Sequence, residues 1–192
     1  MKLRSLLWRI GRFIYKYARK ENFHSAEKNG EFRLIRSIIK LIDTKEKPIF
    51  IDVGAFKGEW SLYVLKQLDN QQKKGKVYAF EPAYNTFNYL KEKLKNKKNI
   101  LLRKTAFSER CGLKEFFIFG ELNGTNSLIQ NKNASIHKVN TITIDQFVEK
   151  NNLKNISFIK SDTEGHDYSV IMGAKKTFKN ELIDFWQFEY NL

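Results

Sequence analysis

The 192 residues of this chain suffice for one domain with a hydrophobic core but hardly for two. With 42% hydrophobic residues and two prolines, the composition excludes a disordered protein, and the single cysteine excludes an internal disulfide. The formal net charge of +14 would suit a nucleic acid or an anionic membrane, yet an A/T-rich coding sequence also produces such an excess of lysine. We therefore expect no nucleic-acid partner from charge alone. No apolar run approaches the roughly 18 residues of a membrane span, so a cytoplasmic protein is expected.

The first 20 residues differ from the rest of the chain, because they hold four of the eight arginines and no acidic residue. Placed at about 100° per residue, they form a helix with a basic face and an apolar arc. The arc consists of Leu3, Leu6, Leu7, Ile10, Phe13, Ile14 and Tyr17. Such an arc either packs on the domain, which we favour, or lies in an anionic membrane interface. Residues 1–47 are thus expected to be a basic, amphipathic helical extension, with contact to the inner membrane surface through residues 2–20 as the alternative.

From residue 48 onward, short apolar runs alternate with amphipathic stretches. Strands are predicted over 49–55, 76–82, 100–108, 156–165 and 182–191, and helices over 59–70, 84–96 and 168–178. A hairpin is predicted around 113–120, a polar loop over 123–127, and a strand leading into a helix over 139–151. Short apolar strands joined by amphipathic helices are typical of parallel strands with right-handed crossovers. The pattern predicts one α/β domain over residues 48–192, built on a doubly wound, mostly parallel sheet.

Ligands of such sheets bind beyond the carboxyl ends of the strands, where the strand order reverses. Asp52 ends the first predicted strand, and the following turn carries Gly54 and Gly58, which let backbone approach a ligand closely. Glu81 ends the second strand, where an acid can accept hydrogen bonds from two ribose hydroxyls. Asp162 and Glu164 end a later strand. These positions predict a nucleoside site.

The charge of this site argues against a dinucleotide. The turn lacks the G-x-G-x-x-G fingerprint of pyrophosphate binding, because Phe56 stands where the middle glycine belongs. Four carboxylates would also repel a diphosphate, whereas they would attract a ligand that carries an ammonium and a sulfonium. The residues therefore favour S-adenosylmethionine.

Six stretches of the chain resemble the successive signatures of FkbM-type S-adenosylmethionine-dependent methyltransferases. They are 51-IDVGAFKGEWS-61, 79-AFEP-82, 106-AFSERCG-112, 124-GTNSL-128, 141-TITID-145 and 159-IKSDTEGHDYSVIMGA-174. The resemblance covers about residues 48–192, and the D-x-E-G-H-D stretch after the D-V-G-A-x-x-G turn makes it specific. It implies a Rossmann-like methyltransferase fold, S-adenosylmethionine as methyl donor, and O-methylation, often of sugar hydroxyls in polysaccharide, glycolipid or natural-product assembly.

The resemblance also implies roles for individual residues. The cofactor-binding turn is matched by Asp52, Gly54, Ala55 and Gly58. The ribose-binding acid is matched by Glu81, and the adenine contact by Thr105 and Ala106. Those that match the signature beside the methyl group are Asp162, Glu164 and His166. We expect His166 or Glu164 to act as general base, with Asp162 orienting the cofactor or the base. No metal is expected, and Glu189 is a weaker candidate for substrate contact.

Two departures from the family pattern leave alternatives open. Phe56 stands where many relatives carry Asn, and the chain ends directly after the strand predicted over 182–191, where relatives continue through a helix and two strands. That strand would be an exposed sheet edge, which a second copy or another partner could cover. The leading hypothesis is O-methylation of a small-molecule or carbohydrate acceptor. RNA methylation and a non-catalytic scaffold are the alternatives.

Overall fold

The computed structural model describes residues 2–18, 26–43, 47–120, 126–129 and 134–189. These residues form two compact units, residues 1–41 and residues 42–192. Most of the polar loop predicted over 123–127 lies outside the described residues. The ends of the predicted helix 2–20 and of the predicted strand 182–191 lie outside them as well.

The first unit consists of two helices, α1 (Lys2–Ala18) and α2 (Glu31–Leu41). The side chain of Asn29 accepts a hydrogen bond of 2.9 Å from the N–H of Glu31, which caps the start of α2. In α1 the large apolar side chains are exposed, among them Leu7 at 58% and Phe13 at 64%. Within the described residues, no helix combines the length and the apolar character needed to cross a membrane.

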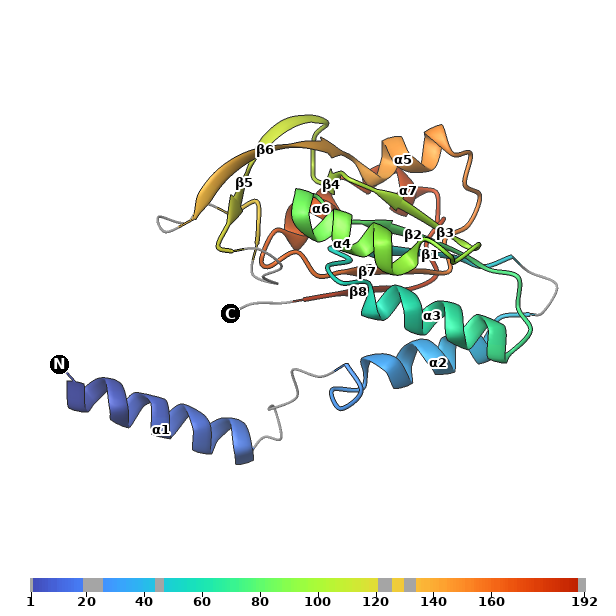
Figure 1. Cartoon of the computed structure of the whole chain (residues 1–192). Coiled ribbons are helices and arrows are strands. Elements are labelled where there is room, and N and C mark those ends of the chain that lie inside the picture. The colour runs from blue at the N-terminus through green and yellow to red at the C-terminus, as the bar shows by residue number, and fades with distance from the viewer. Residues whose placement is uncertain (1, 19–25, 44–46, 121–125, 130–133, 190–192) are drawn as a thin grey trace. The chain divides into compact units, whose positions relative to one another are not determined.

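A five-stranded parallel sheet forms the centre of the second unit (Figure 1), in the order β3-β2-β1-β7-β8. The strands are β1 (Ile49–Val53), β2 (Lys76–Phe80), β3 (Ile100–Arg103), β7 (Phe158–Ser161) and β8 (Trp186–Phe188). The chain first builds outward from β1 to β3 and then returns to the other side of β1 with β7. This reversal creates a switch point between β1 and β7, where an open α/β sheet binds its ligand. The predicted α/β fold is confirmed.

Helices cover both faces of this sheet (Figure 1). They are α3 (Glu59–Asn70) and α4 (Tyr84–Leu94) on one face, and α5 (Ile144–Lys150), α6 (Asp167–Met172) and α7 (Lys175–Lys179) on the other. Because side chains alternate along a strand, Ala79 packs with Leu90 of α4, whereas Phe80 packs with Phe147 of α5, their ring centroids 5.1 Å apart. Both faces of the sheet are therefore buried, and polar chemistry is confined to its carboxyl edge.

A second, smaller sheet stands beside the first and was not foreseen. It contains β4 (Ala106–Phe107), β5 (Gly112–Ile118) and β6 (Ser135–Ile142) in the order β4-β6-β5. Strand β6 pairs in parallel with β4 and antiparallel with β5. The prediction of one strand over 100–108 is wrong, because the chain leaves the large sheet after Arg103. Phe107 then turns into the core against Phe80, with ring centroids 4.3 Å apart.

The helix predicted over 168–178 is also divided, into α6 and α7. A Cβ on Gly173 would lie 2.3 Å from the carbonyl oxygen of Ser108, so only glycine fits at this junction. Helix α7 begins at Lys175, and a residue of α5 caps its N-terminus. The carboxylate of Asp145 accepts hydrogen bonds from the N–H groups of Lys176 and Thr177 at 3.0 and 2.8 Å. A long-range contact thus overrides a helical pattern that is continuous in the sequence.

Candidate active site

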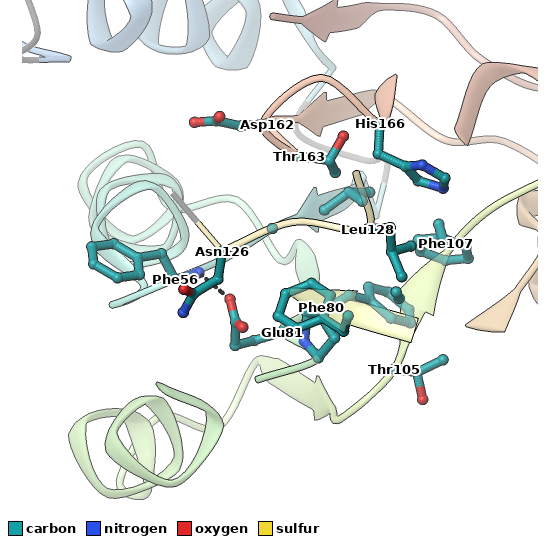
Figure 2. A pocket seen from close by; sticks show the side chains of 15 residues that line it. Phe56, Phe80, Glu81, Thr105, Phe107, Asn126, Leu128, Asp162, Thr163 and His166 are labelled. Atoms are coloured by element: carbon teal, nitrogen blue, oxygen red, sulfur yellow. Dashed lines mark hydrogen bonds between the residues drawn. The ribbon is translucent and has the colours of Figure 1, made fainter. Parts of the chain in front are cut away.

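A cavity of about 540 Å³, open to solvent, lies at the carboxyl ends of β1, β2 and β7 (Figure 2). Of the residues expected in the site, the cavity is lined by Gly54, Glu81, Thr105, Ala106, Asp162 and His166. The rest of its wall includes Phe56, Phe80, Asn126, Leu128 and Thr163. The cavity therefore occupies the switch point of the sheet.

The turn after β1 brings its backbone at Gly54 and the side chain of Phe56 to this cavity. The N–H groups of Gly54 and Ala55 both donate to the carbonyl oxygen of Phe80, at 3.0 and 2.9 Å. Gly54 has a φ of 78°, and a Cβ there would lie 2.0 Å from the carbonyl oxygen of Asp162. Gly58 serves packing instead, because a Cβ there would meet Leu90 of α4 at 2.5 Å. The two glycines therefore have different functions, and only the first lines the cavity.

Glu81 is buried at the end of β2, and backbone groups hold its carboxylate in place. Its Oε2 accepts a hydrogen bond of 3.0 Å from the N–H of Phe56, and its Oε1 accepts one of 2.9 Å from the N–H of Ala83 (Figure 2). Burial raises the pKa of Glu81 to about 7, although these two N–H groups oppose the rise. Each oxygen keeps a second lone pair, so the carboxylate can still accept bonds from a ligand's hydroxyls.

Asp52 lies under the turn and does not line the cavity. Its Oδ2 accepts a hydrogen bond of 2.6 Å from the hydroxyl of Ser61 on α3, while Oδ1 is buried and has no hydrogen-bond partner among the described residues. Burial raises the pKa of Asp52, partly offset by the charge of Lys160. Its carboxylate in turn contributes to the raised pKa of Glu81 through repulsion. Asp52 thus acts on the cavity through charge and turn structure, without contact.

Three carboxylates gather beside the cavity, two of them after β7 and one after β8. Those of Asp162, Glu164 and Glu189 each offer an oxygen within 4.8 Å of the others. Partial burial, followed by the charges of Glu189 and Asp162, raises the pKa of Glu164. Such a group can hold a divalent cation, but the ammonium of Lys160 already pairs with Asp162 at 3.1 Å. Glu164 itself does not line the cavity.

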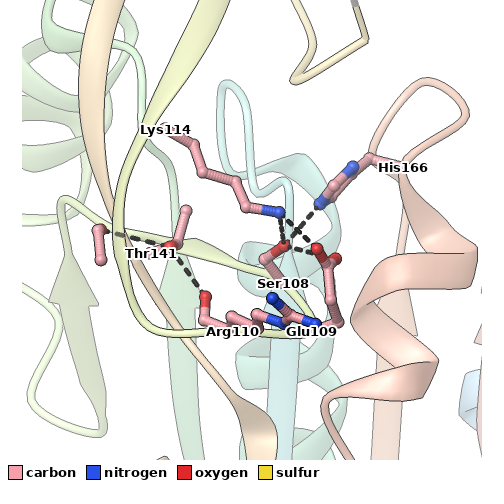
Figure 3. A network of polar contacts seen from close by, with 7 residues as sticks. Ser108, Glu109, Arg110, Lys114, Thr141 and His166 are labelled. Atoms are coloured by element: carbon pink, nitrogen blue, oxygen red, sulfur yellow. Dashed lines mark hydrogen bonds and ion pairs between the residues drawn. The ribbon is translucent and has the colours of Figure 1, made fainter.

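The turn between β7 and α6 presents His166 to the cavity. Asp167 stabilises this turn, because its carboxylate accepts hydrogen bonds from the hydroxyls of Ser161 and Thr163 and from the N–H of Thr163. His166 Nε2 lies 3.0 Å from Ser108 Oγ (Figure 3). Burial, followed by the charge of Lys114, lowers the pKa of His166. The imidazole is therefore neutral near pH 7 and able to accept a proton.

The segment 126–129 lies over this turn and was not foreseen as part of the site. Ser127 pairs with Phe117 of β5 through its backbone, and its hydroxyl donates to the carbonyl oxygen of Glu164 at 3.0 Å. Asn126 lines the cavity and accepts a hydrogen bond of 2.9 Å from the N–H of Phe119. Both residues belong to the stretch 124-GTNSL-128, which carries part of the family resemblance. That stretch was the feature of the sequence that could have indicated them as site residues.

The family described as "Methyltransferase FkbM domain" matches residues 52–191. The chain belongs to the FkbM methyltransferase family. The match spans every strand end that forms the cavity, and it confirms the predicted family. No curated protein was found to match the chain.

Among solved structures, this FkbM chain is similar to a SAM-dependent methyltransferase from Aquifex aeolicus, with 19% identity and a TM-score of 0.35. The similar region covers 66% of this chain and 47% of the other, so the chain spans about half the length of that structure.

S-adenosylmethionine is the cofactor implied for this FkbM protein, and the buried acid at the end of β2 fits it. Glu81, fixed by Phe56 and Ala83, offers lone pairs to a pair of ribose hydroxyls. Thr105 and Ala106 would then lie beside the adenine, and Asp162 near the cationic end.

Proposed function

We propose that this protein is an S-adenosylmethionine-dependent O-methyltransferase whose acceptor is a hydroxyl of a sugar, polysaccharide or glycolipid precursor. The observation that carries the proposal is the presence of Glu81 and His166 in one cavity, a carboxylate suited to accept from ribose hydroxyls and a neutral imidazole. A cofactor scaffold without activity would need the first group and would have no use for the second.

The chemistry divides between the cofactor and the chain. When bound, S-adenosylmethionine supplies a methyl group on a sulfonium. Transfer of this methyl group forms a C–O bond to the acceptor oxygen and breaks the S–C bond, whose electrons stay on sulfur. The proton of the acceptor hydroxyl must then be taken up by a base. His166 is the residue we assign to that proton, since a positioned base contributes roughly 10²–10⁴-fold. Glu81 holds the donor in place, and the turn at Gly54 aligns it with the acceptor. Alignment at about 3–3.5 Å supplies much of the remaining rate.

A neutral acceptor is favoured over RNA by the charges beside the cavity. Asp162 and Glu164 after β7 and Glu189 after β8 place three carboxylates close together, and these would repel a phosphate backbone. The amide of Asn126 and the hydroxyl of Thr163 on the cavity wall suit the hydroxyl groups of a sugar. The family resemblance points the same way.

Two measurements test this function in sequence. Calorimetric titration with S-adenosylhomocysteine asks whether the cofactor site binds, and no binding would refute the proposed function. Transfer of a radiolabelled methyl group from S-adenosylmethionine into polysaccharide, glycolipid and RNA fractions then identifies the acceptor class. Label that appears only in RNA would overturn the proposal.

We also propose that α1 brings the enzyme to an anionic membrane surface, where glycolipid precursors are found. The supporting features are the exposed apolar side chains of α1, including Leu7 and Phe13, and the absence of acidic residues from the first 20 positions. Each Lys or Arg near an anionic surface contributes about 1 kcal/mol. Sedimentation with vesicles tests this: we expect binding to anionic but not neutral vesicles, and weaker binding for Leu7→Asp. Equal binding of Leu7→Asp and wild type would refute it.

A further inference from the structure

Ser108 lies at the centre of a partly buried polar network, and no step described so far uses Ser108 itself (Figure 3). It is fully buried directly after β4, and its Oγ lies 3.0 Å from His166 Nε2, 2.9 Å from Glu109 Oε2 and 2.8 Å from Lys114 Nζ. Lys114 Nζ also pairs with Glu109 Oε1 at 2.7 Å. One hydroxyl thus meets a cation, a carboxylate and the imidazole that we propose as the base.

The backbone of Ser108 holds this hydroxyl in a fixed position. Its N–H donates to the carbonyl oxygen of Ile142 at 2.9 Å, which continues the pairing of β4 with β6. On its other side, the carbonyl oxygen of Ser108 is so close to Gly173 that a Cβ there would approach it to 2.3 Å. The hydroxyl is therefore placed by the small sheet and by the start of the α6–α7 junction together.

The donors and acceptors of this network determine where the protons lie. A serine hydroxyl has one proton and two lone pairs, a lysine ammonium only donates, and an ionised carboxylate only accepts. The ion pair with Lys114 holds the pKa of Glu109 well below its usual range, so Glu109 is ionised. Ser108 therefore gives its one proton to Glu109 and accepts from Lys114. Its remaining lone pair faces His166 Nε2, which must be the donor.

The opposite arrangement leaves an unfavourable contact. If Ser108 donated to His166, its Oγ and the ionised Oε2 of Glu109 would lie 2.9 Å apart with no proton between them. Neutral His166 consequently carries its proton on Nε2 and its basic lone pair on Nδ1. Nδ1 has no hydrogen-bond partner within the described part of the chain, and the side chain of His166 lines the cavity.

We infer that Ser108, held by Lys114 and Glu109, is a positioning residue that fixes the tautomer of His166 and leaves Nδ1 as the nitrogen that takes the acceptor's proton. The inference rests on the proposed function for the role of Nδ1, whereas the tautomer itself does not depend on it. The charged groups that face the imidazole are Lys114 from β5, Glu109 from the turn after β4, and Asp167 from α6.

Nuclear magnetic resonance of the ¹⁵N-labelled full chain tests the tautomer without an acceptor. The His166 signals are assigned by their absence from the His166→Asn spectrum. We expect the proton on Nε2 and, in Ser108→Ala, exchange of that proton with water about tenfold faster, the effect of losing one hydrogen bond of ordinary strength. In Lys114→Met we expect the pKa of His166 to rise, because the cation that opposes its protonation is gone.

Thr141→Val is the matched control. It removes another buried hydroxyl, which donates to the carbonyl oxygens of Arg110 and Gly112 in the same turn but does not touch His166 (Figure 3). It should leave both the exchange rate and the pKa of His166 unchanged. A proton on Nδ1 in the wild type, or equal exchange in Ser108→Ala and Thr141→Val, would overturn the inference. A proton on Nε2 combined with full turnover of His166→Asn would instead refute the proposed base and leave the positioning intact.

Discussion

The two ends of the cavity are built in different ways. At the cofactor end, Glu81 is held by N–H groups of Phe56 and Ala83, on the turns that follow two adjacent strands of one parallel sheet. At the other end, His166 depends on side chains from another sheet, chiefly Ser108 and Lys114. Backbone geometry fixes the first end and contacts between side chains fix the second. Binding and turnover should therefore respond to different substitutions.

The largest expected effect is on turnover alone. His166→Asn should lower the rate of methyl transfer about 10²–10⁴-fold, because it removes the proposed base. Affinity for S-adenosylhomocysteine should stay within about twofold, since hydrogen bonds at the other end hold the cofactor. Transfer of labelled methyl to the acceptor fraction and calorimetry give the two values. Glu164→Gln, outside the cavity wall, should change turnover much less, and the reverse ranking would make Glu164 the base.

A second substitution should affect binding alone. Glu81→Gln should weaken S-adenosylhomocysteine binding roughly 10- to 100-fold, because the amide loses charge-assisted bonds to ribose and turns a donor toward a backbone N–H. Calorimetric titration measures this. The control is Glu92→Gln on α4, the same chemical change at a side chain that is 72% exposed. Equal affinities for the two variants would show that Glu81 does not contact the cofactor.

The pH dependence separates the two ends further. The pKa of Glu81 is about 7 in the folded protein, and ligand hydroxyls would favour its ionised form. Affinity for S-adenosylhomocysteine should therefore fall as the pH drops below 7, by nearly tenfold per unit. For the free protein the sign is opposite: the stability contribution of Glu81 is complete below its unfolded pKa and is lost as the pH rises through 7. Thermal unfolding with and without S-adenosylhomocysteine checks both trends, and Glu81→Gln should remove them.

The smallest effect concerns the turn that carries Phe56. Phe56 has a φ of 47°, a left-handed conformation that Asn adopts more readily than other residues with a side chain. Phe56→Asn should therefore be more stable than Phe56→Ala by about 0.5–1 kcal/mol. Denaturant unfolding of the pair measures the difference. A less stable Asn variant would show that the turn is not strained at this position.

Local sequence patterns explain why the cofactor end was predictable. Gly54 and Glu81 each follow a buried strand directly, and parallel strands bring their carboxyl ends to one edge. The same logic placed Asp52 at the cavity, but the alternation of side chains points it toward Ser61 on α3. The end of a strand specifies the edge of the sheet, whereas the alternation of side chains decides toward which face Asp52, one residue before the end of β1, is directed.

The other end could not be predicted because its contacts join distant parts of the chain. Ser108 and His166 are 58 positions apart. Lys114 contacts Ser108 from β5, whose antiparallel partner β6 begins only at Ser135. The family resemblance indicated His166, and one of the stretches that carry it, 106-AFSERCG-112, contains Ser108. It could not show that the two residues touch.

The cap of α7 has a consequence for the order of folding. A helix of five residues is too short to persist by itself in water, and the carboxylate that binds its first N–H groups belongs to Asp145, 31 positions earlier. Helix α7 is therefore expected to be stable only when α5 is docked beside it. Strand β8 follows α7 and adds to the sheet beside β7. The chain's last segment is thus expected to assemble late, and amide hydrogen exchange should find α7 and β8 among the first segments to open.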